Sequence, residues 1–338
     1  MGLNPLVVDG VLAVDAGNSK TDVALVAADG TVLGTARGGG FQPQIVGTET
    51  AVEVIARIVE RAVDAAGLAP RSGEPLVRHV SACLANADLP VEEQQLELAV
   101  HARGWGGTTR VANDTFALLR AGVDGPRGVA VVCGAGINCA GMLPDGRTAR
   151  FPAIGHLSGD WGGGAGLADE ALWWAARAED GRGGATALAA ALPGHFGLTS
   201  MYALIEALHL GHLAISRKHE LTPVLFATAQ AGDPVARAIV ERQAEEIVVM
   251  ATVALRRLDL LDEEADVVLG GGVLAARHPL LMDSVTSLLA AAAPKAVPKV
   301  VTSPPVLGAA LLGLDRTGAT AEAHARLRAH YASVGSVS

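Results

Sequence analysis

The sequence predicts an α/β protein made of two similarly built domains, and three features support this. The chain has 338 residues, about twice the length of an average domain. Apolar strand-like runs alternate with helical patterns along it, and a segment near the N-terminus recurs near the middle. Such alternation predicts mixed sheets covered by helices, and two such domains would face each other across a cleft.

The repeat consists of three strands joined by short turns. From Val11 the chain reads VLAVDAGNSKTDVALVAADGTVLGTAR, and from Gly128 it reads GVAVVCGAGINCAGMLPDGRTARF. The pairs Asp29-Gly30 and Asp145-Gly146 lie between apolar runs and predict hairpin turns. We conclude that one structural unit is used twice.

The segments after each copy also correspond. In the first half, Thr50 and Glu53 fit a capping box that opens a helix ending at Gly67. This half continues with the strand HVSACLA, a helix from about Pro90 to Gly104 and the strand TRVAND. The second half adds a helical insertion at about 166–253, then the strand ADVVLG, a helix from Pro279 to Ala292, the strand PKVVTS and a final helix from Val306.

The turn GVDGPRG marks the expected domain boundary. The N-terminal domain then covers residues 1–118, and the C-terminal domain covers residues 119–338 with the helical insertion inside it. The helix at about 305–318 could pack back on the N-terminal domain. The C-terminal helical piece AEAHARLRAHYA could cover its own domain or contact a neighbouring molecule.

Composition excludes several classes of function. A net charge of −9 with no long basic run argues against nucleic acid as a partner. The longest uncharged run, Gly128 to Pro144, is broken by glycines and Asn138, so we expect no membrane span. The N-terminal MGLNPLVVDG lacks the pattern of a secretory signal, which indicates a cytoplasmic protein. Three cysteines without a CxxC pair (Cys83, Cys133 and Cys139) are expected to be small core residues.

Two turns of the repeat are candidate phosphate sites. The turn DAGNSKTD joins two strands, so its backbone N–H groups are not consumed by a helix and can form an anion-binding nest. Lys20 adds positive charge, Ser19 and Thr21 add hydroxyl groups, and Asp15 could hold a hydrated Mg²⁺. The alternative is a polar hairpin turn. The second copy has CGAGIN at the same place, and a third glycine cluster, LGGGV, ends a later strand.

The order of these motifs resembles that of a known superfamily. DAGNSKTD, VANDT, CGAGINCAG, SGDWGGG, LGGGV and PPVLGAALLGL follow one another as in the actin, Hsp70 and sugar-kinase ATPases. Within it, the chain is most similar to the BadF/BadG/BcrA/BcrD ATPase family, which includes N-acetylglucosamine kinases. The resemblance runs from about Val11 to Leu314. It implies two ribonuclease H-like domains of the actin-like ATPase type, each a mixed five-stranded sheet with helices, around an interdomain cleft.

The resemblance also implies how ATP and Mg²⁺ bind. Asp15 is expected to contact Mg²⁺ through water. The residues expected to contact the nucleotide lie in three turns: Gly17, Asn18, Ser19, Lys20 and Thr21; Gly134, Ala135 and Gly136; and Gly270, Gly271 and Gly272. The segments VSACLANAD and PPVLGAALLGL are similar to the two connections about which such domains open and close.

Asp114 in VANDT matches the catalytic aspartate of the family, which accepts the proton of the attacking sugar hydroxyl. The alternative is that Asn113 and Asp114 only cap the helix that starts at Thr115. The resemblance places the sugar near Gln42, Gln44, Asn113, Asp114, Asn138 and Asp160.

Three departures from the family pattern concern the substrate. Trp161 stands where the related kinases have a glutamate, and Ala135 and Ile137 replace two hydroxyl residues of the second phosphate turn. The loop GGGFQPQ lacks the usual sugar-binding asparagine, for which Gln42 or Gln44 could substitute.

The leading hypothesis is therefore an ATP-dependent kinase that phosphorylates a hydroxyl of an amino sugar, with N-acetylglucosamine as the first candidate and a homodimer as the expected assembly. One alternative is an ATPase that activates a partner enzyme, of the dehydratase-activator type with a bridging iron–sulfur cluster. The position of Cys133 and Cys139 in or beside the phosphate turn argues against this alternative. Another alternative is a sensor that binds sugar or ATP without turnover.

Overall fold

The computed structural model describes residues 7–69 and 73–335. The chain divides into two compact units, each described by itself below. Unit 1 consists of Met1–Ala130, Ala140–Thr148 and Val301–Ser338, and unit 2 consists of Val131–Cys139 and Ala149–Val300. None of the helices in the described ranges is both long and apolar enough to span a membrane.

The first sheet has five strands in the order β3-β2-β1-β4-β5. They are β1 (Val8–Ala16), β2 (Lys20–Ala27), β3 (Val32–Gly39), β4 (Val77–Leu84) and β5 (Gly106–Asn113). Strand β2 pairs antiparallel with β1 and β3, whereas β1, β4 and β5 run parallel. The sheet is therefore mixed, as predicted.

The second sheet repeats this topology. Its strands are β6 (Gly128–Cys133), β7 (Ile137–Met142), β8 (Thr148–Arg150), β9 (Ala265–Gly270) and β10 (Ala296–Val300), in the order β10-β9-β6-β7-β8. In both sheets the third, second, first, fourth and fifth strands follow one another. This confirms that one structural unit is used twice.

Both predicted Asp-Gly turns are confirmed, and they use the same chemistry. Gly30 and Gly146 have φ values of 85° and 91°, which glycine adopts without steric cost. In each turn the aspartate side chain accepts a hydrogen bond from the N–H two residues later, at 3.0 Å for Asp29 and 2.9 Å for Asp145. The local sequence alone is sufficient to specify these hairpins.

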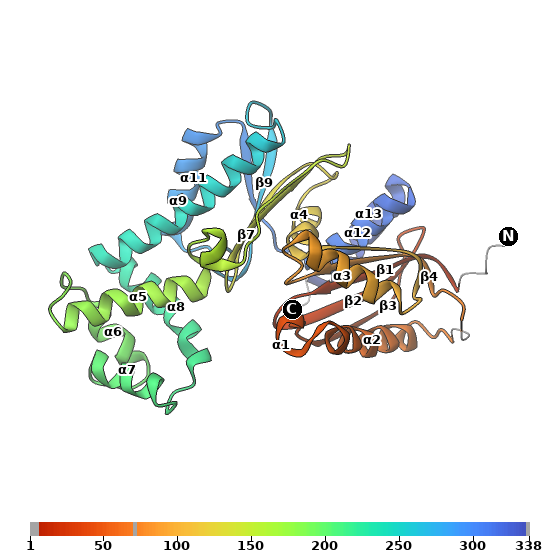
Figure 1. The fold of residues 1–338 in the computed structure, drawn as a ribbon. Coiled ribbons are helices and arrows are strands. Elements are labelled where there is room, and N and C mark those ends of the chain that lie inside the picture. Colours follow the sequence, from red (N-terminus) through yellow and green to blue (C-terminus); the bar gives the residue numbers. More distant parts are fainter. Residues whose placement is uncertain (1–6, 70–72, 336–338) are drawn as a thin grey trace. The chain divides into compact units, whose positions relative to one another are not determined.

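Strand β1 is buried on both faces of its sheet. Leu12, Val14 and Ala16 pack into a core that also includes side chains of α2 (Thr48–Ala65) and α3 (Pro90–His101). Val11 and Ala13 alternate with them and pack into a second core on the other face. Three helices supply that second core: α4 (Asp114–Gly122), α12 (Pro305–Thr317) and α13 (Ala321–Gly335). Figure 1 shows the helices of unit 1 on the two faces of the sheet.

Helix α12 lies in unit 1, where two glycines allow close packing. A Cβ atom on Gly308 would lie 1.7 Å from the carbonyl oxygen of Ala117 in α4, and one on Gly313 would lie 2.3 Å from Val11. Helix α13 also packs on its own unit, because Leu327 and Tyr331 belong to the same core. The C-terminal helix thus covers the sheet formed by the N-terminal residues and not the second sheet, although the expected boundary placed it with residues 119–338.

The helical insertion is a group of short and long helices in unit 2. They are α5 (Gly163–Glu179), α6 (Leu188–His195), α7 (Met201–His209), α8 (Leu221–Gln230) and α9 (Pro234–Arg257), with the 3₁₀ helices η1 (Gly155–Ser158) and η2 (Ile215–Glu220). Helix α9 begins where the Asp233 carboxylate accepts the N–H of Ala236 at 2.9 Å and Pro234 occupies the first turn. Helices α10 (Gly272–Ala275) and α11 (Pro279–Ala292) follow β9.

Two local predictions were wrong. The predicted capping box at Thr50 and Glu53 does not form, because helix α2 already begins at Thr48 with Gly47 as its N-cap. This early start follows from the short helix α1 (Pro43–Val46), which ends one residue before Gly47 caps α2. Glu53 does not close a capping box but pairs with Arg103 at 2.8 Å. Strand β10 covers Ala296–Val300 and not PKVVTS, because its partner β9 begins at Ala265 and ends at Gly270.

Candidate functional site

The polar residues singled out in the first half gather at one edge of the first sheet. Pairing of β1 with β4 places Ala16 beside Leu84, and pairing of β4 with β5 places Leu84 beside Asn113. Because these three strands are parallel, Asp15 near the end of β1 and Asp114 just after β5 lie at the same edge of the sheet. Strand β2 starts at this edge and β3 ends there, since Lys20 pairs with Gly39. The topology thus brings together residues that lie far apart in the sequence.

Two carboxylates of this edge have raised pKa values. The pKa of Asp15 is raised to about 8, chiefly by burial and then by Asp114 and Asp22, against the lowering effect of Lys20 and Arg37. The pKa of Asp114 is raised to about 6, again by burial, although hydrogen bonds from backbone N–H groups lower it. Acidic groups that repel one another in this way favour a bound cation.

Asp22 is a buried acid at this edge with an ion-pair partner. The Arg37 guanidinium donates to its carboxylate from Nε at 2.6 Å and from Nη2 at 3.1 Å. The bidentate geometry gives the Asp22 carboxylate a fixed ion-pair partner at this edge of the sheet. Neither residue of this pair was singled out from the sequence as part of the site, although Asp22 closes the DAGNSKTD motif.

The turn between β1 and β2 has the features of a phosphate site. Gly17 donates its N–H to the carbonyl of Lys20 at 2.9 Å. The N–H groups of Asn18 and Ser19 donate to no atom of the described residues, and both side chains are exposed beside Lys20. Thr21 is fully buried, and its hydroxyl has no hydrogen-bond partner among the described residues. The unused donors fit phosphate oxygens.

The loop after β3, which carries Gln42 and Gln44, is tied to the phosphate turn. Phe41 is buried and donates its N–H to the carbonyl of Gly17 at 2.9 Å. Gln42 Nε2 donates to the carbonyl of Asn18 at 3.3 Å, and Gln44 Nε2 donates to the carbonyl of Asn86 at 3.3 Å. Sequence reasoning did not single out Asn86.

Asn113 caps helix α4, as its alternative interpretation predicted. Its Oδ1 accepts the N–H of Thr115 at 3.0 Å, and its Nδ2 donates to Asp88 at 2.8 Å. Asp114 then occupies the first turn of the helix, where the helix dipole favours a negative charge. The cap therefore fixes the position of the half-buried Asp114 carboxylate.

In unit 2, three glycine-rich segments pack against one another. A Cβ atom on Gly163 would lie 2.4 Å from the carbonyl carbon of Gly136, and one on Gly271 would lie 2.5 Å from that of Cys133. The N–H of Gly164 donates to the carbonyl of Gly134 at 2.7 Å. The N-terminus of α5 therefore holds the turn between β6 and β7, and the glycines of SGDWGGG serve this packing.

The same turn leaves its outer side accessible. Within the described part of the chain, a Cβ atom on Gly134, Gly136 or Gly272 would meet no heavy atom within 4 Å. Ala135 is exposed, whereas the side chain of Ile137 is buried on β7. The backbone of these segments can thus approach a nucleotide closely, and the replacement of hydroxyl residues by Ala135 and Ile137 does not obstruct it.

The remaining predicted sugar residues of unit 2 take part in local hydrogen bonds. Asp160 Oδ2 accepts from the Ser158 hydroxyl at 2.6 Å and from the N–H of Gly155 at 2.9 Å. Asn138 Oδ1 accepts the N–H of Cys139 at 2.7 Å. Trp161 packs under the guanidinium of Arg242, 4.1 Å from the ring centre, and so points along unit 2 towards α9.

The three cysteines are buried and form no disulfide. Burial raises the pKa of Cys133 to about 12 and that of Cys83 well above its usual value. Buried, protonated thiols are poor ligands for a cluster that bridges two subunits. Among the residues described, no group of three or more histidine, cysteine, aspartate or glutamate side chains is arranged to hold a metal ion.

Comparisons with known proteins show the family and relatives to which the chain is similar. Residues 12–313 match the sequence model of the BadF/BadG/BcrA/BcrD ATPase family. The chain is 26% identical over 266 residues to the N-acetylmuramic acid/N-acetylglucosamine kinase of Clostridium acetobutylicum, covering 78% of this chain and 85% of the relative. It is 28% identical over 207 residues to the N-acetyl-D-glucosamine kinase of Dictyostelium discoideum, covering 61% of this chain and 65% of that protein.

A solved structure extends the likeness over nearly the whole chain. The crystal structure of a candidate N-acetylglucosamine kinase from Chromobacterium violaceum superposes with a TM-score of 0.67 at 25% identity. The match covers 90% of this chain and 99% of that protein. The two repeated sheets and the helical insertion are thus a shared architecture.

Proposed function

Because the chain belongs to the BadF/BadG/BcrA/BcrD ATPase family, we propose that it is an ATP-dependent sugar kinase. It transfers the γ-phosphate of Mg-ATP to a hydroxyl of an amino sugar, and the names of its relatives favour N-acetylglucosamine as the acceptor. The observation that carries the proposal is the shared sheet edge, where Asp15, Asp114 and the unpaired donors of the phosphate turn lie together.

Asp114 is the general base of this proposal. A base must be held in place and must be ionised at the working pH. The Asn113 cap holds Asp114 in place. A pKa of about 6 leaves the Asp114 carboxylate mostly ionised near neutral pH. The carboxylate accepts the proton of the acceptor hydroxyl as that oxygen bonds to the γ-phosphorus, while the bond from this phosphorus to the bridging oxygen breaks and ADP leaves.

Phosphate binding is assigned to turns of both units. Asn18 and Ser19 offer backbone N–H groups and Lys20 offers its ammonium group in unit 1. In unit 2 the accessible backbone of Gly134–Gly136 is assigned to phosphate, and that of Gly270–Gly272 to the adenosine. Thr21 is assigned to phosphate binding together with the first turn, since its buried hydroxyl has no hydrogen-bond partner in the ranges that the structure describes.

Mg²⁺ is assigned to Asp15 through water. Bound there with the nucleotide, it would neutralise charge on the phosphate oxygens. The raised pKa of Asp15 fits this role, because a nearby cation favours the ionised carboxylate. Sugar contacts are assigned to Gln42, Gln44, Asn113, Asn138 and Asp160.

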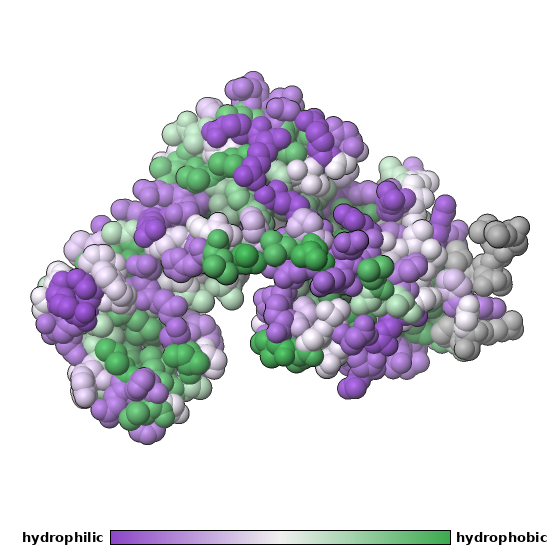
Figure 2. Space-filling view, in the orientation of Figure 1, coloured by the Kyte–Doolittle hydropathy of each residue, from purple (hydrophilic) through white to green (hydrophobic). Residues whose placement is uncertain are grey.

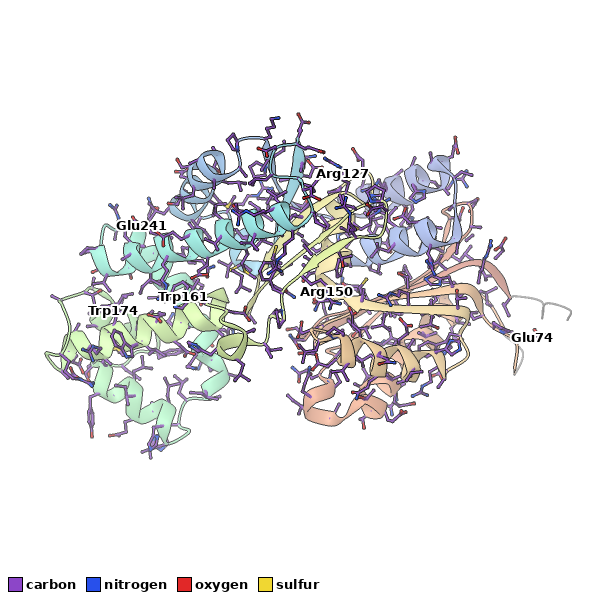
Figure 3. All side chains as sticks on the ribbon, turned by 45° about the horizontal axis from the view of Figure 1, so that its top comes forward. Glu74, Arg127, Arg150, Trp161, Trp174 and Glu241 are labelled. Atoms are coloured by element: carbon purple, nitrogen blue, oxygen red, sulfur yellow. The ribbon has the colours of Figure 1, made fainter. Side chains whose placement is uncertain are left out.

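A homodimer is also part of the proposal, and the apolar surface of unit 2 supports it. Trp173, Tyr202 and Leu210 are 50%, 72% and 58% exposed. Figure 2 shows apolar surface over the end of unit 2 formed by α6 and α7. A groove of about 690 Å³ lies beside Trp161, Trp173 and Trp174 on one side and Arg242 of α9 on the other. Figure 3 shows Trp161 and Trp174 along this side of unit 2.

Light scattering after size exclusion would test the dimer. Trp173→Glu should weaken the dimer if this surface is buried in the dimer interface.

The experiment that tests the kinase measures ADP release with Mg-ATP against glucosamine, N-acetylglucosamine, N-acetylmannosamine, N-acetylmuramic acid, glucose and no sugar. We expect turnover that depends on one or a few sugars and is lost in Asp114→Asn. Asp64→Asn, at an exposed position on α2, is the matched control and should retain full activity. Turnover without sugar would favour the partner-driven ATPase. Nucleotide or sugar binding without turnover would favour a sensor.

A further inference from the structure

Asn86 lies two residues after the end of β4, at the sheet edge that carries Asp15 and Asp114, and its backbone is unusual. Its φ is 63°, in the left-handed region that residues other than glycine rarely adopt. Asparagine tolerates this region better than most residues, yet it remains less favourable there than glycine. A residue held in this conformation invites an explanation from its side chain.

The side chain of Asn86 joins two segments that are distant in the sequence. Its Nδ2 donates to Oδ1 of Asn18 in the phosphate turn at 2.9 Å and to the carbonyl of Phe41 at 3.1 Å. Both N–H bonds of the amide are therefore used, one towards each segment. No other orientation of this amide could donate to both acceptors.

The loop from Gly40 to Gln44 is seated against the phosphate turn by further contacts. A Cβ atom on Gly40 would lie 2.0 Å from the carbonyl oxygen of Asn18, so the two backbones are in close contact. Gln44 Nε2 donates back to the carbonyl of Asn86. The phosphate turn is also held by the β1–β2 pairing, whereas the loop lies beyond the end of β3. Loss of the Asn86 amide should therefore free the loop more than the turn.

The loop also forms one wall of a small cavity. Pro43, Gln44 and Thr48 line one side of a space of about 170 Å³, and Asn86, Glu92 and Leu96 line the other. A shift of the loop would change both the shape of this space and the position of the two glutamines assigned to the sugar.

We infer that Asn86 is a positioning residue that holds the candidate acceptor loop, Gly40–Gln44, on the candidate phosphate turn, and so couples the acceptor contacts to the nucleotide contacts. The inference rests on the proposed kinase function. It assigns to Asn86 a role in acceptor affinity without contact between Asn86 and the reacting atoms.

The test uses two variants of the full chain. Asn86→Gly removes the amide and relieves the backbone, so the fold should be retained. In this variant we expect the acceptor KM to rise roughly tenfold, the effect of about one net hydrogen bond, while the KM for ATP changes much less. Asn86→Asp keeps the shape and the tolerance of positive φ but loses both donors; because it adds a negative charge beside the phosphate turn, it serves only in the exchange measurement below. Gln94→Ala, exposed on α3, is the control and should match the wild type.

Amide hydrogen exchange of the Gly40–Val46 segment provides a readout independent of turnover. It should be faster in both Asn86 variants than in the wild type, with exchange in β1 unchanged. An acceptor KM of Asn86→Gly within twofold of the wild type, or equal increases of its two KM values, would overturn the inference, as would unchanged exchange of the loop. If the wild type phosphorylates no sugar, the proposed function fails, and the exchange comparison alone then decides whether Asn86 tethers the loop.

Discussion

The pair of Arg120 in α4 and Asp315 in α12 yields the sharpest stability prediction for unit 1. The Arg120 side chain is only 2% exposed and donates to both oxygens of Asp315, at 2.7 and 3.1 Å. Its third nitrogen donates to the carbonyls of Val123 and Asp124. The guanidinium thus makes four hydrogen bonds inside the contact between the two helices.

Replacement of Asp315 by alanine would leave the buried guanidinium without its counter-charge. Three hydrogen bonds of the carboxylate disappear, two with Arg120 and one with Nε2 of His324 at 2.8 Å. Arg328, which donates to the carbonyl of Arg120, adds a like charge nearby. Breaking a buried pair by removing one partner costs about 3–5 kcal/mol. We therefore expect Asp315→Ala to lower the free energy of unfolding of unit 1 by about 4 kcal/mol.

The assay is urea unfolding with amide hydrogen exchange of β1 peptides, because the chain contains two units and a single optical transition does not separate them. Asp145→Ala is the matched control in the same unit: its partner Arg147 lies at 2.9 Å, and both side chains are 54% exposed. This variant should lower the free energy of unfolding only slightly, because water screens the exposed pair. A cost for Asp315→Ala no larger than that of the control would refute the reasoning.

Three further predictions follow from buried polar groups. Asp114 acts as base only when ionised, so its pKa of about 6 predicts that kcat/KM falls roughly tenfold per pH unit below pH 6; a profile that stays flat to pH 4.5 would contradict this role. Gln243 is fully buried and accepts the N–H of Gly163 at 2.8 Å. Gln243→Leu should therefore lower the free energy of unfolding of unit 2 by about 1–3 kcal/mol, and an unchanged denaturant midpoint would contradict this cost. The pKa of His79 is lowered to about 4, chiefly by burial and then by Arg316. Because the folded pKa lies below the ordinary 6.5, the neutral His79 contributes folding stability that is complete above pH 6.5 and is lost as the pH falls towards 4. The urea midpoint of His79→Gln should therefore fall less between pH 6.5 and pH 4 than that of the wild type, and equal decreases would exclude His79 as the cause.

The sequence by itself determined the repeated architecture. Apolar alternation, the two Asp-Gly hairpins and the helix at Pro279–Ala292 depend on local backbone preferences and on burial, which short segments express directly. The order of glycine-rich motifs was sufficient to identify the family, since those glycines mark places where two backbones approach closely.

Only the tertiary structure decided how residues far apart in the sequence meet. Three such contacts join distant segments: Arg37 with Asp22, Gln243 with Gly163, and Asn86 with Asn18. Their energies depend on burial and on three-dimensional geometry, which a local sequence pattern does not predict. The start of α2 likewise depended on its neighbour α1 and not on the capping pattern of its own residues. Local propensities are small compared with the free energy of burial, so the sequence alone could specify the strands and turns but not these partners.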